Sequence, residues 1–320
     1  MKIFYYCQHV LGLGHFYRSL EICRGCSVDH DLTMIIGGPD IEVGDEPFSF
    51  LQLPGMKMDD QFGGLISCDP NITVDEGKEM REKQLLTFFN ATTPDCLILE
   101  LYPFGRKAFR FELSPLLEAA EQNSCKVFCS LRDILVEKKE EREKHEERAV
   151  DTLNYYFHSL LVHADPKLVT LDTTFDLMDR IEVPVHYTGF VTPKPRPEAR
   201  TGIRQSLGLG EGEKMIVVSI GSGSVGSHLL EAIYQTAQPI AQKENCQFRF
   251  FTGPYCSSTL YQRLAATQHP NIAVDRFVDN FVDWLAAADL SISMAGYNTS
   301  MNILAAGVPA LMLPFSQNRE

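Results

Sequence analysis

The stretch from Ala288 to Glu320 constrains the fold more than any other part of this chain. The apolar-polar run from Leu290 to Ser293 can enter a sheet, and the apolar run from Ala310 to Leu313 has the composition of a second strand. Between them lie a glycine-containing loop and a run of helix formers from Ser300 to Ala306. The stretch therefore predicts a strand, a loop, a helix and a second strand, in that order.

The predicted helix carries signals at both of its ends. Ser300 can cap its first turn, Gly307 ends it and Pro309 prevents its continuation. The loop before it contains Gly296 and Asn298, which both tolerate unusual backbone angles. In α/β folds, a helix that begins at the carboxyl end of a strand is a place where ligands, above all anions, bind. The alternative is a βαβ turn without a ligand, and the pattern alone leaves both open.

The rest of the chain repeats this alternation on both sides of a proline-rich stretch. Residues 191–200 (VTPKPRPEAR) hold three prolines and four charged residues, which is typical of a semi-rigid linker. We therefore expect an N-terminal domain over residues 1–190 and a C-terminal domain over residues 201–320. Each is predicted to be a Rossmann-like, doubly wound α/β domain, and the two are expected to face each other across a cleft.

Apolar runs, helical periodicity and turn residues predict the individual elements. Strands are expected at 2–7, 32–36, 48–53, 96–100, 126–130, 160–163, 185–189, 214–220, 247–251, 271–274, 290–293 and 310–313. Helices are expected after Gly14 and at 75–90, 113–122, 229–241, 261–267, 281–287 and 300–306, with residues 56–71 as a loop. Residues 137–147 (EKKEEREKHEE) alternate in charge and predict a solvated helix that runs on to about residue 157.

Composition argues against several classes of protein. The chain has 320 residues, 44% of them hydrophobic, which is enough for two ordinary globular domains. Its net charge of -13 argues against non-specific nucleic-acid binding. The first residues (MKIFYYC) do not resemble a signal peptide, and no apolar run reaches the ~18 residues of a membrane span. We expect a cytoplasmic protein, for which peripheral contact with a membrane stays open.

The nine cysteines show no metal-binding framework. Cys23 and Cys26 form one CxxC, but no second pair follows at the spacing of a zinc site. Incidental thiols are therefore favoured over metal or redox use.

Two glycine-containing loops in the second half predict a phosphate site. Gly221 to Ser224 (GSGS) follows a predicted buried strand and precedes a helix, as does the loop from Gly296 to Thr299. Small residues let a phosphate approach backbone N–H groups, and the helix dipole favours its negative charge. Two such loops in one domain predict a diphosphate ligand, and no Asp-x-Asp motif between the strands of this half suggests an obligate metal. The alternative for GSGS alone is a tight turn with no ligand.

The first half contains candidates for acid–base chemistry. His15 ends the sequence Gly12-Leu13-Gly14-His15, which follows the first predicted strand, and could take a proton from an acceptor hydroxyl. The alternative is a histidine that packs or caps at a tight turn. Glu100 ends another predicted strand and is a rival base or an acceptor-binding residue. Arg18 could contact an anionic group or lie on the solvated surface.

The amino-acid sequence of two segments resembles that of the MurG-like group of GT-B glycosyltransferases. These segments are Gly221 to Gly223 and Asp289 to Gln317, the latter with SMAG before its helix and AAGVPALMLP after it. The resemblance covers the whole chain but is weak in the first half. It implies an enzyme that transfers a hexose from a nucleotide-sugar to an acceptor hydroxyl with inversion. A UDP-sugar is the default donor, and neither a metal nor a further cofactor is expected.

The resemblance also assigns residues to the two substrates. Donor-binding residues would be Gly221, Ser222, Gly223, Ser224, Phe277, Gly296, Tyr297, Asn298, Thr299, Asn302 and Gln317. Acceptor-side residues would be Gly12, Gly14 and Arg18, with His15 as the general base and Glu100 as the second catalytic candidate. The acceptor itself is not indicated.

Some residues depart from the MurG pattern. Asn302 stands where the group has a glutamate that binds the ribose hydroxyls, and Met294 stands where MurG has an arginine. These differences suggest a subgroup distinct from MurG. The chain also ends at Glu320, where the resemblance implies further helices, so the second domain is expected to be incomplete.

Two other functions are compatible with the same fold. One is a nucleotide-sugar hydrolase or 2-epimerase, in which Glu100 would matter more than His15. The other is a non-catalytic protein that binds nucleotide-sugars, which Asn302 would favour.

Overall fold

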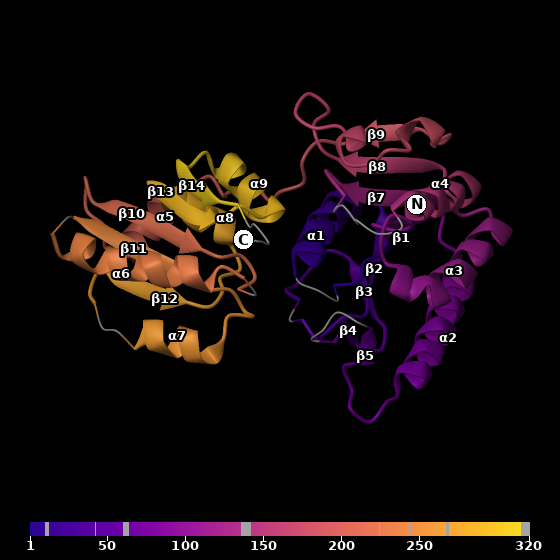
Figure 1. Ribbon diagram of the computed structural model, residues 1–320, viewed down its shortest axis with the longest axis horizontal. Coiled ribbons are helices and arrows are strands. Elements are labelled where there is room, and N and C mark those ends of the chain that lie inside the picture. Colours follow the sequence, from indigo (N-terminus) through magenta and orange to yellow (C-terminus); the bar gives the residue numbers. More distant parts are fainter. Residues whose placement is uncertain are drawn as a thin grey trace. The chain divides into compact units, whose positions relative to one another are not determined.

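The computed structural model describes residues 1–9, 13–41, 43–59, 64–135, 142–223, 225–243, 245–266 and 269–314. The chain divides into two compact units, Met1–Val191 and Thr192–Glu320, with the division inside the proline-rich stretch (Figure 1). Three residues predicted to belong to the site, Gly12, Ser224 and Gln317, lie outside the described residues. Among the helices within the described ranges, none is long and apolar enough to span a bilayer.

The first unit is built on one parallel sheet of seven strands, in the order β3-β2-β1-β6-β7-β8-β9. These strands are β1 (Lys2–Tyr6), β2 (Asp31–Ile36), β3 (Ser49–Gln52), β6 (Cys96–Glu100), β7 (Lys126–Arg132), β8 (Ser159–His163) and β9 (Val185–Tyr187). The helices are α1 (Gly14–Ser27), α2 (Val74–Thr92), α3 (Arg110–Gln122) and α4 (Arg142–Tyr156). Short 3-10 turns are η1 (Lys107–Phe109), η2 (Leu171–Thr173) and η3 (Met178–Arg180).

Continuous apolar runs explain the central strands of this sheet. Every residue of β6 is buried, as are four of the five residues of β1. A strand that is buried on both faces must be apolar throughout, and helices cover both faces of such parallel sheets. One core cluster includes Phe4, and the other includes Tyr5, so consecutive residues of β1 enter different clusters.

Two predictions in the first unit are wrong or incomplete. Residues 56–71 were expected to form a loop, but β4 (Met56–Met58) and β5 (Leu65–Ser67) form a short antiparallel pair. Strands of three residues are too short to show an alternating pattern of apolar and polar residues. In this pair, backbone hydrogen bonds to other segments hold the strands in place. Met56 N–H donates to the Gly37 carbonyl at 2.9 Å, and the Met56 side chain is fully buried.

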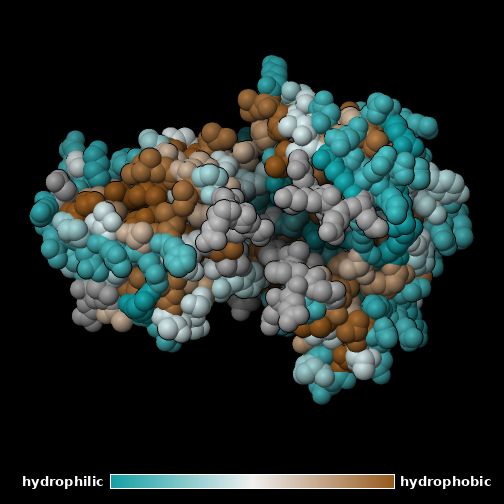
Figure 2. All heavy atoms as spheres, viewed as in Figure 1, coloured by the Kyte–Doolittle hydropathy of each residue, from teal (hydrophilic) through white to brown (hydrophobic). Residues whose placement is uncertain are grey.

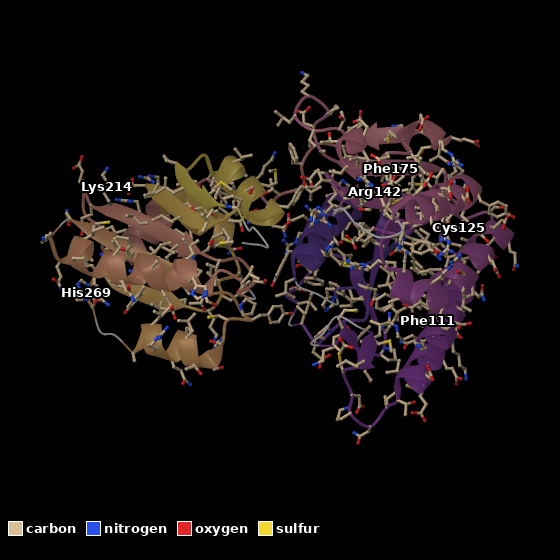
Figure 3. The ribbon with its side chains drawn as sticks, viewed as in Figure 1. Phe111, Cys125, Arg142, Phe175, Lys214 and His269 are labelled. Carbon is tan, nitrogen blue, oxygen red and sulfur yellow. The ribbon has the colours of Figure 1, made fainter. Side chains whose placement is uncertain are left out.

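The charged helix is not wholly solvated. Figure 2 shows hydrophilic side chains gathered over α4, which begins at Arg142 within the described residues. Glu146 is nevertheless buried, because its carboxylate accepts hydrogen bonds from Arg142 at 2.8 Å and from the Asp176 N–H at 3.0 Å. Arg142 lies beside Phe175 (Figure 3) and also donates to the Thr174 carbonyl. One carboxylate of the charged run thus fixes the segment that follows η2.

The second unit has a parallel sheet of five strands, in the order β12-β11-β10-β13-β14. The strands are β10 (Lys214–Ser219), β11 (Cys246–Phe251), β12 (Ile272–Asp275), β13 (Leu290–Met294) and β14 (Ala310–Leu313). The helices are α5 (Ala199–Ser206), α6 (Ser227–Lys243), α7 (Ser258–Ala265), α8 (Phe281–Ala287) and α9 (Tyr297–Ala306). The prediction of two Rossmann-like α/β units is confirmed.

Two boundaries in the second unit differ from the prediction. Helix α5 begins inside the stretch expected to be a linker, and Arg200 ties it to α8 by donating to the Ala287 carbonyl at 3.0 Å. Helix α9 begins at Tyr297, so Ser300 is not its cap; the Ser300 hydroxyl instead donates to the Gly296 carbonyl at 2.8 Å. Serine hydroxyls inside helices commonly bond four residues back in this way. Gly307 ends α9 with a φ of +66°, as predicted.

Candidate active site

The order of strands in the first unit identifies where a ligand site belongs. Strand order reverses between β1 and β6, which pair in parallel through Tyr6 and Leu99. At such a switch point the chain leaves the two strands in opposite directions, and the carboxyl ends of the strands then border a crevice. His15 lies in the first turn of α1, which follows β1, and Glu100 is the last residue of β6.

The structure brings these two side chains together. His15 Nδ1 lies 2.6 Å from Glu100 Oε1, and Arg18 Nη2 donates to the same oxygen at 2.9 Å. Arg106 donates to the other oxygen through Nη2 at 2.7 Å and Nε at 3.2 Å. The Glu100 side chain is 1% exposed, whereas that of His15 is 26% exposed. The carboxylate is therefore locked inside, and the imidazole reaches the surface.

The protonation of the pair follows from its surroundings. Burial alone would raise the pKa of Glu100, but Arg106, His15 and Arg18 outweigh it and hold that pKa well below its usual range. Glu100 is thus ionised and can only accept hydrogen bonds. Two acceptors at 2.6 Å would repel, so His15 Nδ1 must carry a proton and donate it to Glu100. The lone pair of the neutral ring then lies on Nε2.

The imidazole stays neutral near pH 7. Burial lowers the pKa of His15, and the charges of Arg106 and Arg18 act in the same direction, whereas Glu100 opposes them. A neutral imidazole has a free lone pair and can accept a proton, as a general base must.

The structure changes the relation between the predicted residues. His15 and Glu100 were considered as rival bases, yet they form one hydrogen-bonded pair in which Glu100 orients His15. Arg18 is 5% exposed and holds Glu100, so it does not lie on the solvated surface. Gly14 is the first residue of α1.

Arg106 was not predicted as a site residue. Its backbone is left-handed, with a φ of +61°, and this turn after β6 returns the side chain to Glu100. The one sequence feature that could have marked Arg106 as a site residue is its position shortly after the carboxyl end of a predicted strand. Arg132, the last residue of β7, forms an ion pair with Asp133 at 3.2 Å.

A second buried network lies beside this pair and was also missed. Tyr5 OH and Ser130 Oγ are 2.8 Å apart, Ser130 Oγ is 2.8 Å from His163 Nε2, and His163 Nδ1 is 2.7 Å from Thr188 Oγ1. Ser130 is the register partner of Glu100 on the neighbouring strand. Burial, aided by Arg18, lowers the pKa of His163 to about 4, so this ring is neutral.

The second unit has its own switch point between β10 and β13. Ser219 and Ser293 are register partners there, so the loops that follow them leave the sheet at the same edge. Gly221 has a φ of +67°, and a β-carbon added to it would lie 4.0 Å from Thr299 Oγ1 in the first turn of α9. The two predicted glycine-containing loops therefore meet, as a diphosphate site would require.

Polar groups at this edge lack protein partners. The hydroxyls of Ser219 and Ser293 are buried and have no hydrogen-bond partner in the part of the chain that the structure describes. Buried polar atoms are normally hydrogen-bonded, so these hydroxyls are available as donors or acceptors at the switch point. Gly296 caps α9 without a side chain, and Tyr297 and Asn298 follow in its first turn.

The remaining donor-side candidates occupy the same unit. Phe277 follows β12 and is 45% exposed. Asn302 lies one turn along α9 from Asn298, and its Oδ1 accepts a hydrogen bond from Thr192 Oγ1 at 2.8 Å. Within the described ranges, no group of three or more His, Cys, Asp or Glu side chains gathers as a metal site would require. Cys23 and Cys26 are both free thiols.

Comparisons of sequence find a family model that matches within the second unit and relatives that match part of the chain. Residues 217–320 match the family model of the glycosyltransferase family 28 C-terminal domain. Over 124 residues the chain is 32% identical to the UDP-N-acetylglucosamine--N-acetylmuramyl-(pentapeptide) pyrophosphoryl-undecaprenol N-acetylglucosamine transferase of Opitutus terrae, covering 38% of this chain and 32% of that protein. The protein of the same name from Synechococcus is 28% identical over 130 residues, which are 41% of this chain and 32% of that protein. The matched region spans about a third of the length of these relatives.

Comparisons of structure extend to both units. Acinetobacter baumannii MurG matches with a TM-score of 0.53 at 14% identity, over 99% of this chain and 79% of that one. Phytolacca americana UGT2, complexed with UDP-2fluoro-glucose and pterostilbene, matches with a TM-score of 0.60 at 10% identity, over 98% of this chain and 80% of that one. The fold is thus that of the GT-B glycosyltransferases. Within that fold the chain is similar to MurG, and residues 217–320 are similar to the C-terminal domain of glycosyltransferase family 28.

Proposed function

We propose that this protein transfers a sugar from a UDP-sugar to an acceptor hydroxyl with inversion and without a metal. The observation that carries the catalytic half of this proposal is the His15–Glu100 pair, in which a buried, ionised carboxylate fixes the tautomer of a partly exposed imidazole. The donor half is supported by the family 28 match and by the meeting of the two glycine-containing loops.

In this reaction His15 Nε2 takes the proton of the acceptor hydroxyl. The acceptor oxygen forms a bond to the anomeric carbon of the sugar as the bond from that carbon to the diphosphate breaks. A single displacement of this kind inverts the configuration of the anomeric carbon. Glu100 remains ionised and stabilises the imidazolium that forms, because its carboxylate already accepts the Nδ1 proton.

The second unit would stabilise the leaving diphosphate. Backbone N–H groups of the Gly221–Gly223 loop and of the first turn of α9 lie at the switch point, and the dipole of α9 favours negative charge there. Oriented N–H groups of this kind stabilise a developing anion without reorganisation. This arrangement supports metal-independent departure of UDP.

The pairing of Glu100 bears on the alternatives. A carboxylate held by two arginines and a histidine is a poor base, which weakens the hydrolase or epimerase mechanism in which Glu100 would act directly. A non-catalytic nucleotide-sugar binder would not need an oriented imidazole, so the same pair favours an enzyme.

The test is His15→Ala, assayed for UDP release from UDP-sugars with a panel of hydroxyl acceptors, beside His186→Ala as a control on exposed His186 of the same unit. General-base catalysis contributes roughly 10²- to 10⁴-fold, so His15→Ala should lose about that factor while UDP affinity is kept. Equal rates in both variants would remove His15 from the mechanism. Binding of UDP without turnover by the unchanged protein would support the non-catalytic alternative.

A further inference from the structure

The loop that joins β11 to α7 packs against the first glycine-containing loop, backbone on backbone. The Tyr255 N–H donates to the Ser222 carbonyl at 2.8 Å. The peptide between Ser222 and Gly223 is planar, so this bond fixes the Gly223 N–H on the opposite side of that peptide. The orientation of a donor in the proposed diphosphate loop thus depends on a residue outside it.

Two glycines make this close approach possible. Gly253 has a φ of +83°, and a β-carbon added to it would lie 2.3 Å from the Ser222 carbonyl carbon and 2.4 Å from the Gly221 oxygen. Gly223 has a φ of +92°, and its added β-carbon would lie 2.5 Å from the Cys256 nitrogen and 2.6 Å from the Thr252 oxygen. All of these neighbours are backbone atoms, which cannot rotate away as a side chain can.

The β11–α7 loop is itself anchored to the next strand. The Thr252 N–H donates to the Asp275 carbonyl at 3.0 Å, and the Gly253 N–H donates to the Arg276 carbonyl at 2.8 Å. The Arg276 guanidinium donates to the Cys256 carbonyl at 2.9 Å and stacks over the Tyr261 ring at 4.3 Å from its centre. Hydrogen bonds to the end of β12 therefore hold the β11–α7 loop in place, and this loop in turn contacts the glycine-containing loop after β10.

We infer that Gly253 is a positioning residue for the diphosphate of the donor, because its missing side chain lets the β11–α7 loop fix the backbone of Gly221 to Gly223. The inference rests on the proposed function. It adds that recognition of the second phosphate depends on a contact between two loops and not on the Gly221–Gly223 loop alone. A shift of a few tenths of an ångström in that loop would weaken the N–H contacts of the diphosphate but not those of the nucleoside.

The experiment compares Gly253→Ala with a matched control, Gly212→Ala. Gly212 lies in the same unit with nearly the same φ, +87°, but nothing lies within 4 Å of an added β-carbon. Both variants therefore carry the backbone strain of alanine at positive φ, and only Gly253→Ala must displace the other loop. Calorimetry with UMP and UDP gives the gain in affinity that the second phosphate provides.

We expect this UMP-to-UDP gain to fall at least tenfold in Gly253→Ala and to stay within twofold of the unchanged protein in Gly212→Ala. An unchanged gain in Gly253→Ala would overturn the inference and leave the proposed function standing. If the unchanged protein bound no UDP, the proposed function would fail and the inference with it.

A second variant covers the case in which Gly253→Ala does not fold. Arg276→Met keeps the backbone carbonyl that holds Gly253 and removes the guanidinium contacts to the β11–α7 loop. It should lower the UMP-to-UDP gain severalfold without a change in UMP affinity. Equal losses for UMP and UDP would mean that the loop acts on the nucleoside or on folding, and would also overturn the inference.

Discussion

His163 gives a stability prediction whose size follows from its surroundings. The ring is buried between Ser130 and Thr188 as a neutral imidazole, and burial together with Arg18 lowers its pKa from 6.5 to about 4. The folded state therefore resists protonation that the unfolded state accepts. A group whose folded pKa is depressed in this way contributes stability above its unfolded pKa and loses that contribution as the pH falls.

The pH window and the magnitude can both be stated. Between pH 6.5 and pH 4 the proton binds only to the unfolded chain, which costs about 2 kcal/mol at pH 5 and about 3 kcal/mol at pH 4 for this one residue. At pH 7 the cost is negligible. His163→Gln keeps hydrogen-bonding groups at the position but cannot titrate, so its stability should fall by about 2 kcal/mol less than that of the unchanged protein between pH 7 and pH 5.

Hydrogen exchange of the β8 amides measures the stability of the first unit at each pH. Trp284, the only tryptophan, lies in α8 of the second unit, so its fluorescence during urea unfolding provides an internal control. From pH 7 to pH 5 the free energy of exchange should fall more in the unchanged protein than in His163→Gln. The urea midpoint of the tryptophan transition should be the same in both proteins. Parallel exchange profiles would refute the reasoning, because His163 would then be protonated in the folded state.

Further predictions concern catalysis and the core of the first unit. Glu100→Gln should lower turnover on the order of a hundredfold or more, with UDP affinity unchanged, since the imidazole loses its orienting carboxylate; a rate within threefold of the original would contradict this. In the unchanged protein, kcat/KM should be flat above neutral pH and fall as the pH drops through the pKa of His15, which burial holds below 6.5; a rise toward acid would exclude His15 as a base. Arg81→Met should destabilise the first unit by about 3–5 kcal/mol in urea unfolding, because it removes the ion-pair partner, 2.6 Å away, of the fully buried Glu112 carboxylate; a cost below about 1 kcal/mol would show that this ion pair does not stabilise the fold. EDTA should leave turnover unchanged, and its loss with recovery on adding Mg²⁺ would contradict metal independence.

Much of the fold could be predicted because the strands of a parallel sheet are continuous apolar runs. Most residues of the runs at β1, β6 and β10 are buried, so sequence locates these strands closely. The β4–β5 pair has no such run, and it forms because tertiary hydrogen bonds hold Met56 and Cys68. Helix α5 was not predicted because the prolines that precede it are typical of a linker.

The site could be predicted residue by residue but not as an arrangement. His15 and Glu100 each follow a strand, which marks both as candidates, but their contact depends on the pairing of β1 with β6 across about ninety residues of sequence. The convergence of Arg18 and Arg106 on Glu100 depends in addition on a left-handed turn at Arg106. No local pattern specifies either. The supporting role of Gly253 is equally invisible, because a glycine after a strand looks like any other turn.

Calorimetric titration with UDP, TDP, GDP and CDP tests the central claim most directly. The account predicts selective binding of one nucleoside diphosphate, UDP, and tighter binding of UDP than of UMP. Equal and weak binding of all four diphosphates, or none at all, would contradict the claim that the second unit is a nucleotide-sugar domain. In that case the GT-B fold would stand without the function proposed for it.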